Sequence, residues 1–190
     1  MRGLLLSNIV FALLSGCCYA ASLPVDIEHS NVSIRVFKKG LFSGFAHDHE
    51  IAAPLSSGVV DLAALSVEVR FDARQLTVLD PDASPGDRAK VQETMLSDKV
   101  LDTARFPEIS FVSRSVMPAG DDAYTVEGDL TLHGATHPLT LKVSLKNNHY
   151  TGSVHLKQTD FGITPIRVFG GSVKVKNEVE ISFDIVLKIQ

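Results

Sequence analysis

Residues 173–189 read VKVKNEVEISFDIVLKI, and this C-terminal stretch decides the fold. Nearly all of its odd-numbered positions are apolar, and nearly all of its even-numbered positions are charged or polar. Such alternation with a period of two is typical of an antiparallel strand that has one side on the core. At ~3.3 Å per residue, a flat strand over the whole stretch would exceed about 50 Å. That length does not fit a compact domain of 190 residues, so we expect the strand to bend, as strands do in barrels.

The same alternation recurs upstream of this strand. It is clearest in residues 66–72, 124–132 and 139–146. The turn residues that separate the strands are SSG at 56–58, PAGD at 118–121, HGA at 133–135, KNN at 146–148 and GG at 170–171. Several short strands with one apolar face predict an all-β fold, either a closed barrel or a sandwich. We favour the barrel because closure leaves no exposed edge strand.

One segment, residues 85–96, has the signals of a helix. Ser84 is a suitable N-cap, Pro85 takes the first helical position and Asp87 places an acid in the first turn. Val91 and Met95 then form a short apolar stripe. The stripe predicts a helix packed on the barrel; a gating lid over an opening is the alternative.

The first 20 residues have the pattern of a signal peptide. An apolar run follows Arg2, and it is too short to span a membrane. Two cleavage sites overlap at its end. Cleavage before Cys17 would give a lipid-anchored protein, and cleavage before Ala21 would release a soluble one. Either way we expect an exported, periplasmic protein, with a membrane tether through Cys17 in the first case.

Composition excludes several functional classes. Hydrophobic residues make up 45% of the chain and charged residues 21%, which argues against disorder. The formal net charge of −4 argues against a nucleic-acid partner. The two cysteines are adjacent and lie in the leader, so no disulfide framework is expected. The sequence contains no nucleophile elbow, phosphate loop or zincin motif, so we expect a protein that is not an enzyme and needs no cofactor.

Five segments, in order, resemble those of the YceI-like family of exported lipocalin-like β-barrels that bind polyisoprenoid lipids. They are residues 26–30 with their His-Ser pair, Arg88 with Met95 and Leu96, the block Phe106–Ile109 with Phe111, residues 126–134, and residues 160–163 with the strand 175–185. The resemblance implies an elongated antiparallel barrel of about eight strands over residues 23–190. It also implies that the barrel carries a long-chain, isoprenoid-type lipid.

Residues 44–50, which read GFAHDHE, depart from the usual family pattern. On a strand, His47 and His49 share a face with Phe45 and Ile51. If that face lines the barrel, both imidazoles enter the cavity. Two histidines at this spacing also suit zinc or copper, but a metal site needs a third ligand. Polar lining, contact with a ligand and a metal site therefore all remain open.

Three further residues complete the predicted ligand-binding set. Arg88 forms an ion pair or reaches a pyrophosphate head group. Phe111 and Phe183 belong either to the core or to the lining of a hollow barrel. The favoured function is a non-enzymatic lipid carrier. The alternatives are a metal-binding protein or metal-dependent enzyme built on His47 and His49, and a packed interaction module without a ligand.

Overall fold

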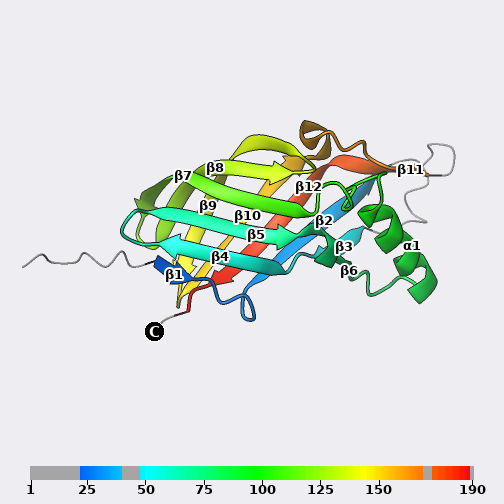
Figure 1. Cartoon of the computed structure of the whole chain (residues 1–190). Coiled ribbons are helices and arrows are strands. Elements are labelled where there is room, and N and C mark those ends of the chain that lie inside the picture. The colour runs from blue at the N-terminus through cyan, green and yellow to red at the C-terminus, as the bar shows by residue number, and fades with distance from the viewer. Residues whose placement is uncertain (1–21, 40–47, 169–172, 189–190) are drawn as a thin grey trace, which may run out of the picture.

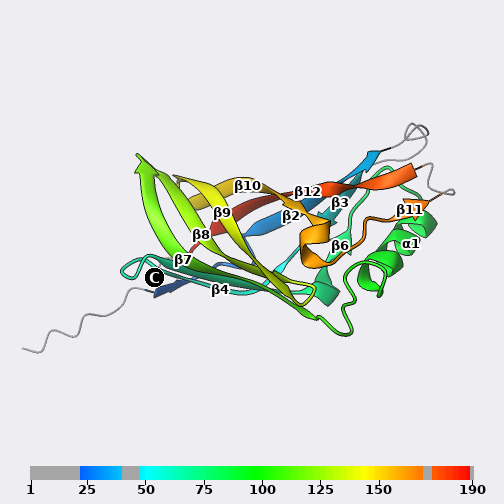
Figure 2. The same ribbon diagram turned by 90° about the horizontal axis from the view of Figure 1, so that it is seen from above.

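The alternating segments form an antiparallel sheet that curls around an apolar interior (Figures 1 and 2). The computed structural model describes residues 22–39, 48–168 and 173–188. Their strands are β1 (Ser22–Pro24), β2 (Asn31–Lys39), β3 (His49–Ala52), β4 (Leu55–Asp61), β5 (Ser66–Asp72), β6 (Thr77–Val78), β7 (Glu108–Gly120), β8 (Ala123–Leu132), β9 (Ala135–Lys146), β10 (His149–Lys157), β11 (Arg167–Val168) and β12 (Val173–Val186). Eight of these strands have seven residues or more, namely β2, β4, β5, β7, β8, β9, β10 and β12. The predicted all-β barrel of about eight strands is confirmed.

The sheet order brings distant parts of the chain together. The strands follow one another as β1-β4-β5-β7-β8-β9-β10-β12-β2-β3-β6, and β11 pairs with β12. At one end of the molecule β1 joins β4 to the end of β12. The amide of Val25 donates to Gly58 O at 2.9 Å, and Val25 also bridges Leu187. The two sides of the sheet therefore meet at this end and enclose the interior.

Strand β12 bends as its length requires. Its pairing with β2 shifts register between Val175 and Val179, which marks an irregularity in the strand. Beyond that point Val179, Ile181 and Phe183 face the interior, while Ser182 is exposed between them. From Val179 to Ile185 the odd-numbered face of β12 is therefore the inner face, as the alternation predicts.

The helix α1 (Pro85–Leu96) packs on one end of the barrel. Its N-cap is Ser84, whose Oγ accepts a hydrogen bond from the Asp87 amide at 3.1 Å. Met95 is buried, and Gln92 ties the helix to the segment beneath it. The Gln92 side chain donates a hydrogen bond from Nε2 to Leu76 O at 2.8 Å. Its Oε1 accepts a hydrogen bond from the Val78 backbone amide at 2.7 Å. Among the described residues, no helix has the length and apolar character needed to cross a membrane.

Gly128 in β8 lies where a side chain has no room. A Cβ at this position would stand 2.5 Å from the Phe111 ring and 2.5 Å from the backbone oxygen of Val112. We expect Gly128→Ala to lower the free energy of unfolding by about 1–3 kcal/mol, because a main-chain atom cannot move aside easily. Gly86 in α1 is the matched control, since no atom lies within 4 Å of its Cβ position. Urea unfolding should show the loss only for Gly128→Ala; equal stabilities for the two variants would contradict the packing.

Candidate ligand cavity

A cavity of about 400 Å³ runs through the barrel. This volume lies within the range of about 300–1,000 Å³ that is usual for ligand pockets. Five of its lining residues are polar: Asp61, Ser66, Tyr124, Tyr150 and Gln158. All the others are apolar, and on the long strands they include Ile34, Val69, Phe71, Phe111, Val126, Leu130, Leu139, Leu141, Val154, Leu156, Ile181 and Phe183. The barrel is thus hollow and apolar rather than solidly packed.

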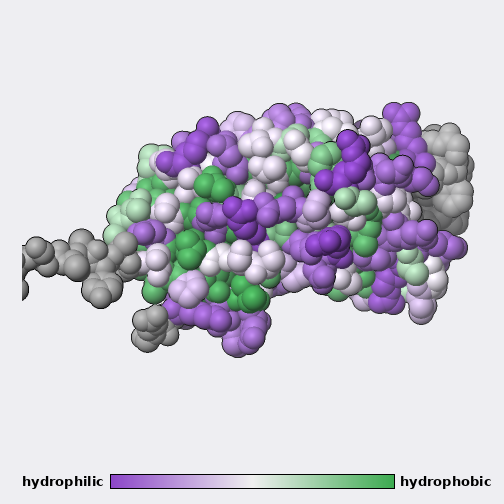
Figure 3. Space-filling view, in the orientation of Figure 1, coloured by the Kyte–Doolittle hydropathy of each residue, from purple (hydrophilic) through white to green (hydrophobic). Residues whose placement is uncertain are grey.

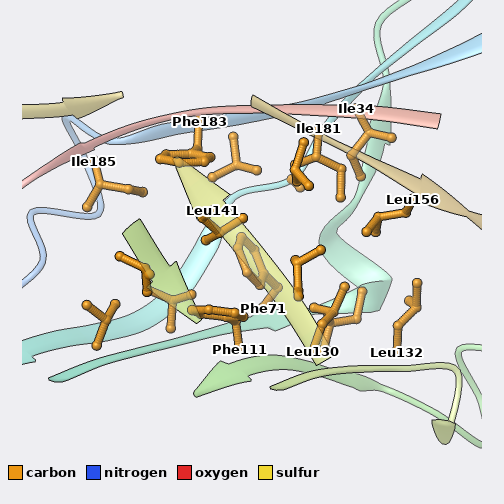
Figure 4. Close-up of a pocket in the computed structure, with 18 of the residues that line it drawn as sticks. Ile34, Phe71, Phe111, Leu130, Leu132, Leu141, Leu156, Ile181, Phe183 and Ile185 are labelled. Carbon is orange, nitrogen blue, oxygen red and sulfur yellow. The ribbon is translucent and has the colours of Figure 1, made fainter. Parts of the chain in front are cut away.

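Several different strands supply the apolar walls. In Figure 4, Ile181, Phe183 and Ile185 of β12 face Phe111 and Leu130 of β7 and β8 across the cavity. The side chains of Phe71 and Leu141 lie between these two walls (Figure 4). Each wall comes from the inner positions of alternating strands, so the apolar lining follows directly from the period-two pattern.

The two ends of the cavity differ in exposure. At the α1 end the lining residues Leu76, Met95 and Ile163 are buried. At the opposite end, in the turn between β4 and β5, the lining residues Leu62 and Leu65 are 46% and 45% exposed. The cavity therefore reaches the surface beside the β4–β5 turn, and we call this end the mouth.

Most of the polar lining residues lie on strand ends near the mouth. Tyr124 and Tyr150 lie near the start of β8 and of β10, and Asp61 and Ser66 flank the β4–β5 turn. Burial raises the pKa of the Tyr150 phenol, and the neighbouring Tyr124 adds to the effect. The Tyr150 hydroxyl can donate a hydrogen bond to a polar group at the mouth.

Comparison with known protein families matches residues 24–187 to the YceI-like domain. The chain belongs to the YceI-like family. A UPF0312 protein of Vibrio vulnificus is 30% identical over 171 residues, which cover 85% of this chain and 80% of the relative. A UPF0312 protein of Shewanella denitrificans is 30% identical over 154 residues, or 75% of this chain and 71% of that protein.

Solved structures of two proteins share the fold. Burkholderia cenocepacia BcnA has a TM-score of 0.65 at 22% identity, covering 86% of this chain and 99% of BcnA. A Campylobacter jejuni YceI protein has a TM-score of 0.51 at 12% identity, covering 82% of this chain and 86% of that protein. Together with the cavity, the YceI-like fold supports a lipocalin-like binding protein.

The YceI-like barrel places the predicted ligand-binding residues in different surroundings. Ile51, Phe111 and Phe183 line the cavity. Phe45 and His47 lie outside the described residues. For these five residues, contact with a ligand stays a prediction.

His49 lies on β3 and contacts a buried carboxylate. Its Nδ1 is 2.6 Å from Oδ2 of Asp80, and Oδ1 of Asp80 accepts a hydrogen bond from the Glu50 amide at 2.9 Å. The Asp80 side chain is buried. This contact joins β3 to the loop before α1, and His49 is not among the described residues that line the cavity. A role for His49 in ligand binding also stays a prediction.

Arg88 holds the same loop from the side of α1. Its guanidinium donates to Leu79 O at 3.2 Å and to Ala83 O at 3.5 Å. Among the described contacts, the guanidinium therefore reaches two carbonyl oxygens rather than the carboxylate of an ion pair. Contact between Arg88 and a head group is untested.

Among residues 22–39, 48–168 and 173–188, no group of three or more histidine, cysteine, aspartate and glutamate side chains is arranged to hold a metal ion. His47, one of the two histidines of the predicted pair, lies outside these ranges. Sequence reasoning also missed the tyrosines at the mouth, Tyr124 and Tyr150. Their positions among the inner residues of β8 and β10 were the available signal, because Tyr124 has the parity of Val126 and Tyr150 that of Val154.

Proposed function

We propose that this protein is an exported, non-enzymatic carrier that holds one long apolar chain of the isoprenoid type inside its barrel. The observation that carries this proposal is the apolar cavity of about 400 Å³ with a mouth at one end. Each methylene moved from water into such a lining contributes about 0.8 kcal/mol, before the cost of ordering the chain. A long tail therefore binds without any charged contact.

The cavity also favours a carrier over the alternative functions. A packed interaction module would have a filled interior. The described lining residues include no histidine, cysteine, lysine or arginine, and Asp61 is their single carboxylate. An acid–base or nucleophilic mechanism normally needs at least two cooperating groups. The lining suits retention of an apolar chain better than chemistry on it.

The isoprenoid class rests on membership of the YceI-like family, and chain selectivity tests it. Isoprenoid alcohols and straight-chain alcohols of equal carbon number would compete with a fluorescent apolar probe for the purified protein. We expect the isoprenoid alcohols to bind at least tenfold more tightly. Equal affinities would overturn the isoprenoid assignment and keep the carrier, whereas no competition from either series would overturn the carrier.

Export follows from the proposed signal peptide over residues 1–20, ahead of a barrel domain over residues 23–190. We expect the mature protein to begin at Cys17 or at Ala21, because both cleavage patterns end the apolar run. Mass analysis of the mature N-terminus decides between them. A diacylglyceryl group on Cys17 would establish a lipid anchor, and an unmodified Ala21 a soluble protein. Recovery of exported protein that retains Met1 or Arg2 would contradict the proposal.

A further inference from the structure

The turn between β4 and β5 has an unusual composition for its place in the fold. It reads Leu62-Ala63-Ala64-Leu65 between Asp61 and Ser66, and all four of these apolar residues are exposed. Glycine, asparagine and aspartate dominate hairpin turns. Two other turns at this end follow that rule, with Asp121-Asp122 between β7 and β8 and Asn147-Asn148 between β9 and β10.

The backbone conformation of the β4–β5 turn is unusual for a leucine at position 65. Leu65 has a φ of 50°, in the left-handed region that a leucine rarely adopts. The neighbouring turns place Asp122 and Asn148 in the same region, where such residues are tolerated. Local backbone preference would therefore place asparagine or glycine at position 65, so the leucine must have a different role.

The Asp61 side chain pairs two of the backbone amides of the turn. The Asp61 carboxylate accepts hydrogen bonds from the amides of Ala63 and Ala64, at 2.9 and 2.7 Å. With these donors paired, transfer of the turn to a less polar medium costs less free energy. On the face shown in Figure 3, apolar patches are larger over the half that contains this turn, where hydrophilic patches separate them, than over the half around α1.

Two connections point to a lipid surface as the partner. Leu62 and Leu65 line the cavity as well as the outer surface, so the apolar lining continues onto the turn. In addition, Ser22 of β1 pairs with Asp61, so the N-terminal segment enters the barrel beside the turn. An anchor on Cys17 would hold the mouth within about 20 Å of a membrane, at up to ~3.6 Å per residue.

We propose that the β4–β5 turn, residues 61–66, docks the cavity mouth on a membrane surface by inserting its leucines and alanines among the lipids. A ligand then passes between bilayer and cavity along apolar side chains and does not cross water. The passage of a ligand rests on the proposed carrier function, but docking itself does not.

The fluorescence of an introduced tryptophan tests docking without emission from native tryptophans, because the chain contains none. Ala64→Trp would report from the turn, and Val112→Trp from an exposed position on the outer face of β7. With phosphatidylcholine vesicles, we expect the emission of Ala64→Trp to shift to shorter wavelength and to be quenched by brominated lipids. The emission of Val112→Trp should not respond. An unchanged Ala64→Trp spectrum would overturn the proposal.

Substitutions at Ala64 make the test quantitative, because its side chain is exposed and does not line the cavity. In vesicle flotation of the unlipidated mature protein, Ala64→Glu should reduce the bound fraction at least fivefold. Ala64→Leu should increase it, and Val112→Thr should leave it unchanged. Equal flotation of Ala64→Glu and the parent protein would overturn docking.

Two further results separate docking from neighbouring explanations. The emission wavelength of Ala64→Trp could instead depend on protein concentration in the absence of vesicles and not respond to vesicles. That result would assign the turn to contact between copies of this chain and overturn the lipid partner. Uptake of an apolar probe, measured in vesicle-free solution, should be the same for Ala64→Glu and the parent. Docking without uptake would overturn the carrier alone, and uptake without docking would overturn the docking proposal alone.

Discussion

Replacing Ile181 with aspartate is expected to lower the free energy of unfolding by about 3 kcal/mol or more. Ile181 lies on the inner face of β12, paired with Ile34 on β2 and Val154 on β10. All three residues line the cavity. The substitution removes a branched apolar side chain; this loss costs about 2–5 kcal/mol in a packed core, and the half-buried Ile181 on the cavity wall belongs at the lower end of that range. It also places a carboxylate among apolar neighbours, where it finds no compensating charge.

Ser182→Asp is the matched control for this prediction. Ser182 is the next residue on the same strand, and its side chain is exposed on the outer face. The same charge placed there should change the stability by no more than about 0.5 kcal/mol. Urea unfolding followed by circular dichroism would compare the two variants. Similar losses at both positions would contradict the assignment of inner and outer faces.

Filling the cavity is expected to abolish most of the binding. Leu141 on β9 projects between the two walls of the cavity (Figure 4). A tryptophan at this position adds ring volume where the proposed chain would lie, and the cavity holds only about 400 Å³. We expect Leu141→Trp to weaken the binding of a long isoprenoid alcohol at least tenfold, in a competition assay with a fluorescent apolar probe.

Thr140→Trp introduces the same residue on the opposite face of β9. Thr140 is exposed, so this variant should bind the alcohol as tightly as the parent protein. Circular dichroism would confirm that both variants fold. Parent-like affinity in Leu141→Trp would place the ligand outside the cavity.

The architecture followed from the sequence because its determinants are local. In residues 173–189, the alternation and the length together predict a bent strand with an apolar inner face, and β12 has both properties. The helix was predictable for the same reason. The Ser84 cap, Pro85 and the position of Met95 all lie within one short segment of sequence.

The details of the site depend on contacts between distant segments, which no local pattern reports. His49 shares its parity with Ile51, yet only Ile51 lines the cavity. His49 lies at the end of the short strand β3, where it meets Asp80 from the loop before α1. The mouth was equally hidden. Tyr124, Tyr150 and Leu65 line one cavity only because the sheet from β5 through β7, β8 and β9 to β10 curls around it.

Native mass spectrometry of the mature protein, purified without detergent from the cells that make it, tests the carrier most directly. We expect the mass of the chain plus one bound molecule. Extraction with organic solvent should release that molecule as a lipid with a long apolar tail, and the protein should take up an added isoprenoid alcohol in its place. A spectrum that shows the chain alone, both before and after incubation with the alcohol, would contradict the proposal that the barrel carries a lipid.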